Sequence, residues 1–343
     1  MAGFLSGEGR EWTGIVEGVG EWHDNYEVLP CLTYSASMME RSATLRSYVL
    51  LAIANLVWAL DYPLYKMALP HYLSPYALSS MALIFAGLAC LVSFAFVRGE
   101  KVARGDYWKL ALAGVLIGLI KKSCFMVSMS LTSPIDGSII SSVGPVLVLL
   151  ISVLFAIDRI TPMKLFGMLL GLAGTVMIVL VTRHRGDGSD RVAGNLVMLG
   201  GMVASSFYYV WIKGLVNKYK PLTILRWVYI FAALFALPVG VDTIPKVDFS
   251  AMHAGGALLV AYLILAPTLV PNFFVIASTR FVSPTVVSMY GYMQPVIATM
   301  LSVMLGQDRL SWGQVAAGLI IFVGVYFVIR SYQTPVSPVH HIR

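Results

Sequence analysis

Three charged residues fall where apolar helices would bury them: Asp61, Lys121 and Lys122. A carboxylate beside two ammonium groups at membrane depth could hold the anionic group of a small molecule or carry a proton. Asp61 lies roughly 22 Å of helix beyond Arg46, and Lys121 roughly 21 Å beyond Tyr107, at about 1.5 Å per residue. The matching depths predict that Asp61 pairs with one lysine, either in a substrate site or as a permanent ion pair between two helices. Because adjacent residues on a helix diverge by about 100°, at most one lysine is expected to face the centre of a cavity.

The elements that carry these charges must lie in a membrane. Of the 343 residues, 58% are hydrophobic and 12% are charged, against about 25% charged in an average soluble domain. The mean hydropathy is +0.79. This composition excludes water-soluble, disordered, collagen-like and disulfide-scaffold proteins. The net charge of +7 is attributed to basic cytoplasmic loops rather than to nucleic-acid binding. No metal-ligand spacing, GxSxG motif or P-loop occurs in the sequence, so we expect no metal, no cofactor and no enzyme activity.

The predicted fold class is an all-α integral membrane protein with ten transmembrane helices. The apolar stretches long enough to cross a bilayer lie at about 45–69, 74–97, 107–130, 134–156, 161–182, 193–214, 222–241, 255–279, 284–306 and 311–330. If the N-terminus is cytoplasmic, most basic residues between the spans lie on the cytoplasmic side. We therefore expect an N-in and C-in protein of the bacterial inner membrane.

The ends of the chain differ from the spans. Residues 1–44 precede the first span, and their acidic beginning lacks the basic-then-apolar order of a signal peptide. They are either the product of an incorrectly assigned start codon, since Met38 and Met39 stand just before the span, or a flexible tail. Residues 331–343 form a predicted cytoplasmic tail.

The sequence repeats itself at a shift of 150 residues, which aligns the fourth and fifth spans with the ninth and tenth. The shift pairs Ser133-Pro134 with Ser283-Pro284, Ser138 with Ser288, Pro145-Val146 with Pro295-Val296, Ser152-Val153 with Ser302-Val303, Asp158-Arg159 with Asp308-Arg309, and Gly174 with Gly324. The predicted halves are 45–182 and 193–330, with five spans each. An odd number of spans gives the halves opposite orientations. Inverted repeats of this kind are typical of secondary transporters, which bind substrate near the midplane.

At these positions the sequence resembles the EamA-like family of the drug/metabolite transporter superfamily, over about residues 45–332. The resemblance rests on Asn55, Trp58, Lys66, Ser74-Pro75, the segment 130–136 and Pro145 in the first half, and on the segment 283–290, Gln294-Pro295 and the segment 306–308 in the second. It implies a ten-helix fold, a central cavity lined mainly by helices one, three, four, six, eight and nine, and export of small metabolites such as amino acids. The sequence departs from the family at Ala82, where many relatives carry Arg, and at Lys121-Lys122, where uncharged polar residues are more usual.

Prolines within the spans point to the same cavity. Pro145 and Pro295 occupy equivalent places, and each removes a backbone donor. Pro63 does so close to Asp61, and Pro267 with Pro271 is predicted to break the eighth span. Irregular backbone at membrane depth is tolerated where it lines a cavity. The predicted substrate-binding residues are Trp58, Asp61, Lys121, Lys122, Tyr208, Asn272, Tyr290 and Gln294, and Tyr292 is expected to point inward beside them.

Other polar residues are explained by structure alone. Asp136 follows Ser133-Pro134, which is typical of a helix start. Arg226, near one end of the seventh span, is expected to snorkel towards the membrane surface. Gly167, Gly171 and Gly174 have the spacing of a close helix contact, either within the chain or in a dimer.

The predicted function is a secondary-active or facilitative transporter that exports a small polar metabolite, an amino acid or a related organic anion or zwitterion, by alternating access. Its expected partners are the substrate, membrane lipids and, as an optional coupling ion, protons; no nucleic acid is expected. The chain would act as a monomer or a homodimer. The alternatives are a membrane-embedded enzyme or carrier acting on a lipid or isoprenoid phosphate through Lys121 and Lys122, and a non-transporting membrane regulator.

Overall fold

The structure of the protein is a computed structural model that describes residues 28–69, 71–155, 161–184, 188–250, 252–282 and 284–333. The acidic stretch before residue 28, the Asp158-Arg159 connection, Ser283 and most of the predicted C-terminal tail lie outside these residues. The chain forms two compact units, residues 1–45 and 46–343. The described part of the first unit is the beginning of one helix, and everything below concerns the second unit.

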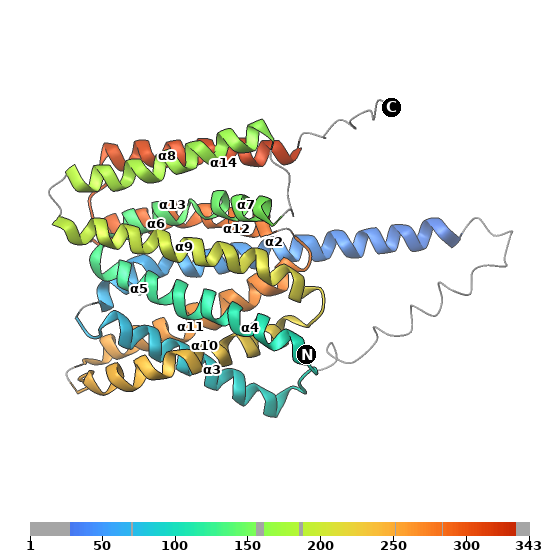
Figure 1. Ribbon diagram of the computed structural model, residues 1–343, viewed down its shortest axis with the longest axis horizontal. Helices are drawn as coiled ribbons and strands as arrows, with labels where there is room; N and C mark the ends of the chain where they lie inside the picture. Colours follow the sequence, from blue (N-terminus) through green and yellow to red (C-terminus); the bar gives the residue numbers. More distant parts are fainter. Residues whose placement is uncertain are drawn as a thin grey trace. The chain divides into compact units, whose positions relative to one another are not determined.

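The described residues are helical and contain no strand (Figure 1). The α-helices are α2 (Val28–Ala68), α3 (Pro75–Phe96), α4 (Tyr107–Ala113), α5 (Lys122–Leu131), α6 (Pro134–Ser141), α7 (Gly144–Leu154), α8 (Pro162–His184), α9 (Gly188–Val216), α10 (Pro221–Thr243), α11 (Ala254–Thr279), α12 (Pro284–Met289), α13 (Met293–Met304) and α14 (Trp312–Gln333). A π-helical segment, Gly114–Lys121, joins α4 to α5, and a 3-10 turn, Tyr290–Tyr292, joins α12 to α13.

Eight helical stretches among the described residues are long and apolar enough to cross a membrane. They are Ala43–Ala68, Pro75–Phe96, Arg104–Leu131, Pro134–Leu154, Asp190–Val216, Pro221–Lys246, Ala254–Thr279 and Val286–Met304. Two shorter apolar stretches, Pro162–Gly174 and Trp312–Gly324, lie within α8 and α14. The fold is therefore that of an all-helical membrane protein, as the composition predicts.

Ser-Pro pairs begin two of these helices. The Ser74 hydroxyl accepts a hydrogen bond from the backbone N–H of Ala77 at the start of α3. At the start of α6, Ser133 accepts from the N–H of Asp136 in the same way. The helix start predicted at Ser133-Pro134 is thus confirmed. Asp136 itself is buried, and its carboxylate accepts a hydrogen bond of 2.6 Å from the side-chain amide of Gln314 in α14.

Helices that correspond in the two predicted halves pack against each other. In Figure 1, α8 lies beside α14 at one edge and α3 beside α10 at the opposite edge, and both pairs are in contact. Between these edges, α6 contacts α13 and α7 contacts α12. α6 and α7 are the two parts of one interrupted helix, and α12 and α13 are the two parts of another. The first part of each thus packs on the second part of the other.

Glycines allow the close approach of α8 to α14. A Cβ atom on Gly174 would lie 2.9 Å from the backbone oxygen of Ala317, and one on Gly324 would lie 2.6 Å from that of Gly167. Backbones this close leave no room for a side chain. Of the two interpretations of the glycine spacing, the structure favours packing within the chain.

Arg226 contradicts the expectation that it snorkels. Its side chain is 1% exposed. The guanidinium donates to the Ser93 hydroxyl at 2.7 Å and to the backbone oxygens of Ser93 and Val97 at 2.6 and 3.1 Å, and it lies 4.4 Å from the centre of the Phe94 ring. The Ser93 carbonyl already accepts from the N–H of Val97, whereas the Val97 carbonyl follows the last turn of α3, where helical donors run out. Arg226 thus caps the end of α3 from the neighbouring helix α10 and is buried there.

We expect Arg226→Met to lower the free energy of unfolding by about 2 kcal/mol or more, because buried carbonyls would lose charged donors. Denaturant titration of the purified protein in detergent measures this loss. Arg98→Met is the matched control, since Arg98 is exposed in the neighbouring loop and should change stability little. Equal stability of the two variants would contradict the capping role.

Candidate functional site

Two helices are interrupted at equivalent places. α6 ends at Ser141 and α7 begins at Gly144, while α12 ends at Met289 and α13 begins at Met293. Pro145 and Pro295 follow the two interruptions at the 150-residue shift. A proline has no N–H for the carbonyl four residues earlier, so each proline leaves local backbone without its helical partner. The two interruptions bring irregular backbone from both halves to the middle of the molecule.

The remaining prolines do not break their helices. Pro63 lies inside α2, and Pro267 and Pro271 lie inside the continuous helix α11. The prediction of a break in the eighth span is therefore wrong.

Two side chains of α2 explain why α11 stays intact. Pro267 leaves the carbonyl of Leu263 without its helical donor, and Pro271 does the same to the carbonyl of Pro267. The Tyr65 hydroxyl donates to the oxygen of Leu263 at 3.0 Å, and the Trp58 indole N–H donates to that of Pro267 at 3.2 Å. Neighbouring side chains thus satisfy the freed carbonyls, as membrane helices with proline require.

This arrangement predicts a coupling between Trp58 and Pro271. Trp58→Phe should cost about 1 kcal/mol of unfolding free energy through its lost hydrogen bond. In a Pro271→Ala background the loss should shrink, because the introduced alanine would offer its own N–H to the carbonyl of Pro267. A double-mutant cycle by denaturant titration in detergent measures the difference. Trp227 contacts Tyr107 and serves as the control residue. The stability costs of Trp227→Phe and Pro271→Ala should be additive. An equal cost of Trp58→Phe in both backgrounds would contradict this explanation.

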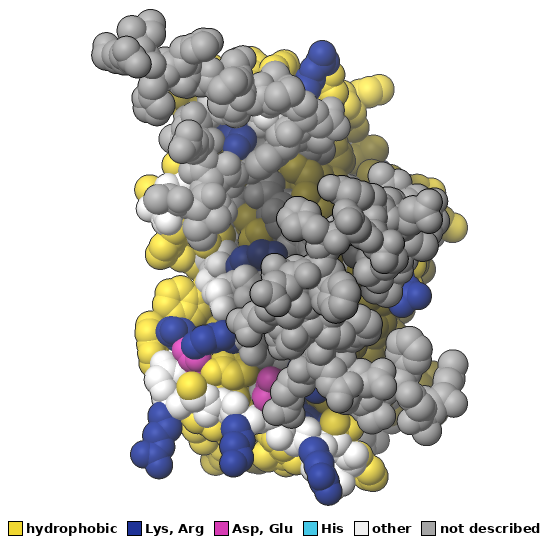
Figure 2. Space-filling model, turned by 90° about the vertical axis from the view of Figure 1, so that its right-hand side faces the viewer, with side chains coloured by type: hydrophobic (Ala, Val, Ile, Leu, Met, Phe, Trp, Pro, Cys, Tyr) yellow, Lys and Arg dark blue, Asp and Glu magenta, His cyan; other side chains and the backbone are white. Residues whose placement is uncertain are grey.

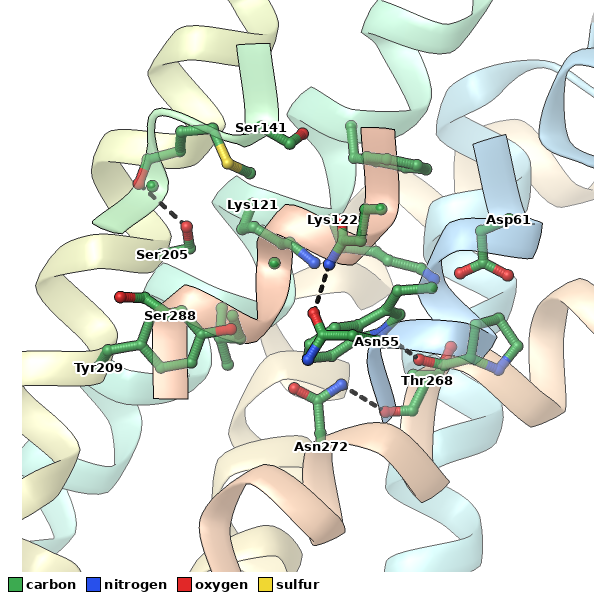
Figure 3. Close-up of a pocket in the computed structure, with 18 of the residues that line it drawn as sticks. Asn55, Asp61, Lys121, Lys122, Ser141, Ser205, Tyr209, Thr268, Asn272 and Ser288 are labelled. Atoms are coloured by element: carbon green, nitrogen blue, oxygen red, sulfur yellow. Dashed lines mark hydrogen bonds between the residues drawn. The ribbon is translucent and has the colours of Figure 1, made fainter. Parts of the chain in front are cut away.

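A cavity of about 80 Å³ lies between the interrupted helices, α2, α9, α11 and the α4–α5 region (Figure 3). A single buried water needs about 10–15 Å³, so the cavity could hold several waters or a small solute. Its polar lining is Asn55, Asp61, Tyr62, Lys121, Lys122, Ser141, Ser205, Tyr209, Tyr229, Thr268, Asn272, Ser288 and Gln294.

The structure places six of the eight predicted binding residues in the wall of this cavity: Trp58, Asp61, Lys121, Lys122, Asn272 and Gln294. Of the predicted kink prolines, Pro145 and Pro267 also line it, whereas Pro63, Pro271 and Pro295 do not.

Tyr208 and Tyr290 are not among the lining residues, which corrects two predictions. Tyr208 is 1% exposed and packs in an apolar cluster, and the next residue, Tyr209, lines the cavity instead. One residue turns the helix by about 100°, so a one-position error changes the face. Tyr290 stacks on Tyr48, and Tyr292 packs on Phe322.

Both lysines line the cavity, contrary to the expectation of one. They stand where the π-helical segment Gly114–Lys121 passes into α5. A π turn contains more residues than an α turn, so successive side chains diverge less, and such segments are frequent at functional sites. In Figure 3 both side chains extend from this element into the same space.

The predicted ion pair between Asp61 and a lysine is not present. Among the described residues, no ion pair with Asp61 is formed, and its buried Oδ1 has no hydrogen-bond partner. Lys122 donates to the Tyr65 hydroxyl at 2.7 Å instead, and its ammonium lies 5.1 Å from the centre of that ring. Aromatic faces thus hold the cations, and the carboxylate keeps an unused acceptor.

The ammonium of Lys121 lies 4.9 Å from the centre of the Trp58 ring. Trp58 therefore has two contacts: its N–H binds the backbone of α11, and its face receives a lysine. The cavity contains two cationic groups and one carboxylate without a donor, which is the arrangement that a small anion or zwitterion could complete.

Sequence reasoning missed a hydrogen-bonded chain in the cavity wall that joins α2 to α6 and α13. The side-chain amide of Gln294 donates to Asn55 Oδ1 at 2.7 Å. The Tyr62 hydroxyl lies 3.0 Å from Gln294 Oε1 and 2.6 Å from the Ser141 hydroxyl. The signal was helical spacing in the first span, where Asn55, Trp58 and Tyr62 share one face. This chain links α2 to both interrupted helices.

Comparisons with known proteins agree with a transporter fold. The EamA-like transporter family matches residues 45–180 and 192–330. An uncharacterized transporter of Archaeoglobus fulgidus is 22% identical over 83% of this chain and 99% of its own. The uncharacterized inner membrane transporter YedA of Escherichia coli is 24% identical over 83% of this chain and 91% of its own. One chain of known crystal structure superposes with a TM-score of 0.61 at 19% identity, covering 85% of this chain and 98% of its own.

Proposed function

Because the chain belongs to the EamA-like transporter family, we propose that it exports a small polar metabolite across the bacterial inner membrane by alternating access. The substrate class is an amino acid or a related organic anion or zwitterion. The observation that carries this class is the buried, unpartnered carboxylate oxygen of Asp61 in a cavity that also receives Lys121 and Lys122. A substrate carboxylate would meet the lysines, and a substrate ammonium would meet Asp61.

The proposed architecture is ten transmembrane helices in two inverted halves, 45–182 and 193–330. In addition to the eight candidate spans, α8 and α14 would be the fifth helix of each half. Pairing of α6 with α13 and of α7 with α12 fits two interrupted helices that cross in opposite directions. Two inverted halves of this kind can open a midplane site to either side in turn.

A pair of lysines gives independent support for the repeat. Lys66 in α2 donates to the backbone oxygens of Met129 and Thr132, at 3.3 and 2.8 Å. Lys213 in α9 donates to those of Thr279 and Val282, at 2.5 and 3.1 Å. The four acceptors are related by the same 150-residue shift. In each half, therefore, a lysine of the first helix holds the end of the third.

The proposed topology is N-in and C-in. Figure 2 shows several Lys and Arg side chains on the face at the right-hand side of Figure 1, where α4 begins. An excess of basic residues is typical of the cytoplasmic side. We place this face in the cytoplasm.

The function is tested by untargeted metabolite profiling of cells and medium, with and without expression of the protein. We expect at least one small charged or zwitterionic compound to fall inside the cells and rise in the medium. An unchanged profile, or a change confined to lipid-linked phosphates, would contradict the proposal. The second outcome would favour the enzyme or carrier alternative.

Energy coupling is tested with proteoliposomes and the compound found by profiling. If Asp61 carries a coupling proton, flux should follow an imposed pH gradient in the parent protein but not in Asp61→Asn. If flux through the unmodified protein does not depend on the pH gradient, transport is not driven by protons, and facilitated diffusion is favoured.

A further inference from the structure

A compact polar cluster joins the loop before α4 to the loop between α9 and α10. Asp106, which directly precedes α4, is 3% exposed. Its carboxylate accepts from Lys109 at 2.8 Å, from Lys218 at 2.7 Å and from the Tyr219 hydroxyl at 2.7 Å. The hydrogen bond to Asp106 raises the pKa of the Lys218 ammonium above its usual value. Asp106 belongs to the first proposed half, whereas Lys218 and Tyr219 belong to the second.

Two further hydrogen bonds tie the same loops together. The backbone N–H of Ala103 donates to the Tyr219 hydroxyl at 3.1 Å, and that of Lys220 donates to the Glu100 carboxylate at 2.9 Å. We call the contacts of Tyr219 with Asp106 and Ala103 the Asp106 latch.

A second tyrosine makes the corresponding contact elsewhere in the molecule. The hydroxyl of Tyr72, which follows α2, lies 3.3 Å from Nδ1 of His253, and the two ring centres are 5.7 Å apart. His253 directly precedes α11 and accepts a hydrogen bond from the backbone N–H of Gly256 at 3.1 Å. We call the Tyr72–His253 contact the His253 latch.

One shift relates the two latches. Adding 147 to the residue number converts Lys66 to Lys213, Tyr72 to Tyr219 and Asp106 to His253. In both latches a tyrosine after the first helix of one half contacts the residue before the third helix of the other half. Lys66 and Lys213, which cap the third helices, share this shift of 147 residues, whereas the carbonyls that they bind are related by a shift of 150. If the halves are inverted, the two latches lie at opposite faces of the membrane.

The two latches differ in strength. In the Asp106 latch the Tyr219 hydroxyl donates to a carboxylate, and a hydrogen bond to an ionised carboxylate is about twice as strong as one between neutral groups. The His253 latch is one longer contact between side chains in an exposed setting. Opening the Asp106 latch therefore breaks more and stronger interactions than opening the His253 latch.

We infer that these latches are symmetry-related closures of the two membrane faces, and that their unequal strength biases the protein towards opening on the side of His253. This inference rests on the proposed inverted repeat and alternating access. It goes beyond them by assigning one closure to each face and by stating which closure opens first. Under the proposed topology, the stronger closure is cytoplasmic.

The test measures access to the cavity from each side and needs no substrate. A single reporter, Ser205→Cys in the cavity wall, is placed in a background in which Cys31, Cys90 and Cys124 are replaced by Ser. A membrane-impermeant maleimide is applied to right-side-out and inside-out vesicles, and its reaction rate is measured. Before any latch is changed, we expect faster labelling from the side of His253.

Tyr219→Phe and Tyr72→Phe each remove one hydroxyl while keeping the ring. We expect Tyr219→Phe to raise labelling from the Asp106 side by about 2- to 10-fold, the factor for one hydrogen bond, and Asp106→Asn to raise it further. Tyr72→Phe should raise labelling only from the opposite side, by a smaller factor. Tyr76→Phe, an exposed tyrosine near Tyr72, is the control and should change neither rate.

Labelling that rises from the same side in both latch variants, or that changes in neither, would overturn the inference. Because the readout is access rather than flux, failure of the latches is distinguishable from failure of the proposed export. Cells could release no metabolite while the latch variants still shift access. Equally, cells could export a metabolite while the labelling rates stay unchanged in both tyrosine variants.

Discussion

Replacing Lys121 and Lys122 together with methionine is expected to reduce export by about 10- to 100-fold or more, since each hydrogen bond to a charged group contributes about 1.5–3 kcal/mol. Methionine keeps the length and apolar contacts of the stem but removes the ammonium that would hold a substrate anion. The single variants should each retain more activity than the double variant, because both side chains enter the cavity. The measurement is release of the profiled metabolite into the medium at matched protein levels.

Lys246→Met is the matched control for this experiment. Lys246 forms an exposed ion pair with Asp242 at one end of a helix, and neither residue lines the cavity. Its replacement should leave export unchanged. Full export by the Lys121→Met/Lys122→Met variant would remove the lysines from the substrate site and leave them a purely structural role.

Replacing Asp61 with asparagine is expected to reduce export by about 10-fold, and most strongly for compounds that carry an amino group. The substitution keeps the size of the side chain and removes the charge that would attract a substrate ammonium, a loss of about 1.5 kcal/mol or more. Asp61 forms no ion pair within the part of the chain that the structure describes, so the variant breaks no salt bridge there. A loss of export that is confined to amino compounds would therefore concern the solute rather than a helix contact.

The control for Asp61→Asn is Asp242→Asn, which neutralises an exposed carboxylate and should leave export intact. Two results would contradict the role assigned to Asp61. One is unchanged release of the amino compound by Asp61→Asn. The other is an equal loss for substrates with and without an amino group, which would indicate a general defect in folding or gating.

The sequence was sufficient to predict the membrane class, the helix start at Ser133-Pro134 and the shared depth of Asp61, Lys121 and Lys122. These predictions depend on composition, local capping and axial rise, all of which are properties of a single helix. The family resemblance likewise rests on local motifs, and the family match covers both halves.

Predictions that depended on the rotation of a helix or on contacts between helices were less successful. Tyr208 and Tyr209 have the same chemistry, and only packing decides which of them faces the cavity. The prediction for the lysine pair was wrong because a π-helical segment changes the angle between successive side chains around the helix axis. No residue type in the sequence predicts such a segment.

The prolines of α11 illustrate the same limit. A proline pattern alone predicts a broken helix, but Tyr65 and Trp58, about 200 residues away, supply the missing donors. The expected ion pair of Asp61 failed because the lysines found partners on α2: Lys122 binds the Tyr65 hydroxyl, and Lys121 lies over the ring of Trp58. Long-range partners of this kind follow from the three-dimensional arrangement and not from spacing along the chain.

The central claim is that the charged cavity binds the transported solute. It is tested most directly in proteoliposomes loaded with a mixture of proteinogenic amino acids and common organic acids, with release followed by mass spectrometry. We predict that the unmodified protein and Lys246→Met release at least one of these compounds at similar rates. Asp61→Asn and Lys121→Met/Lys122→Met should release the same compound at least about 10-fold more slowly. Equal release by all four proteins would contradict the claim.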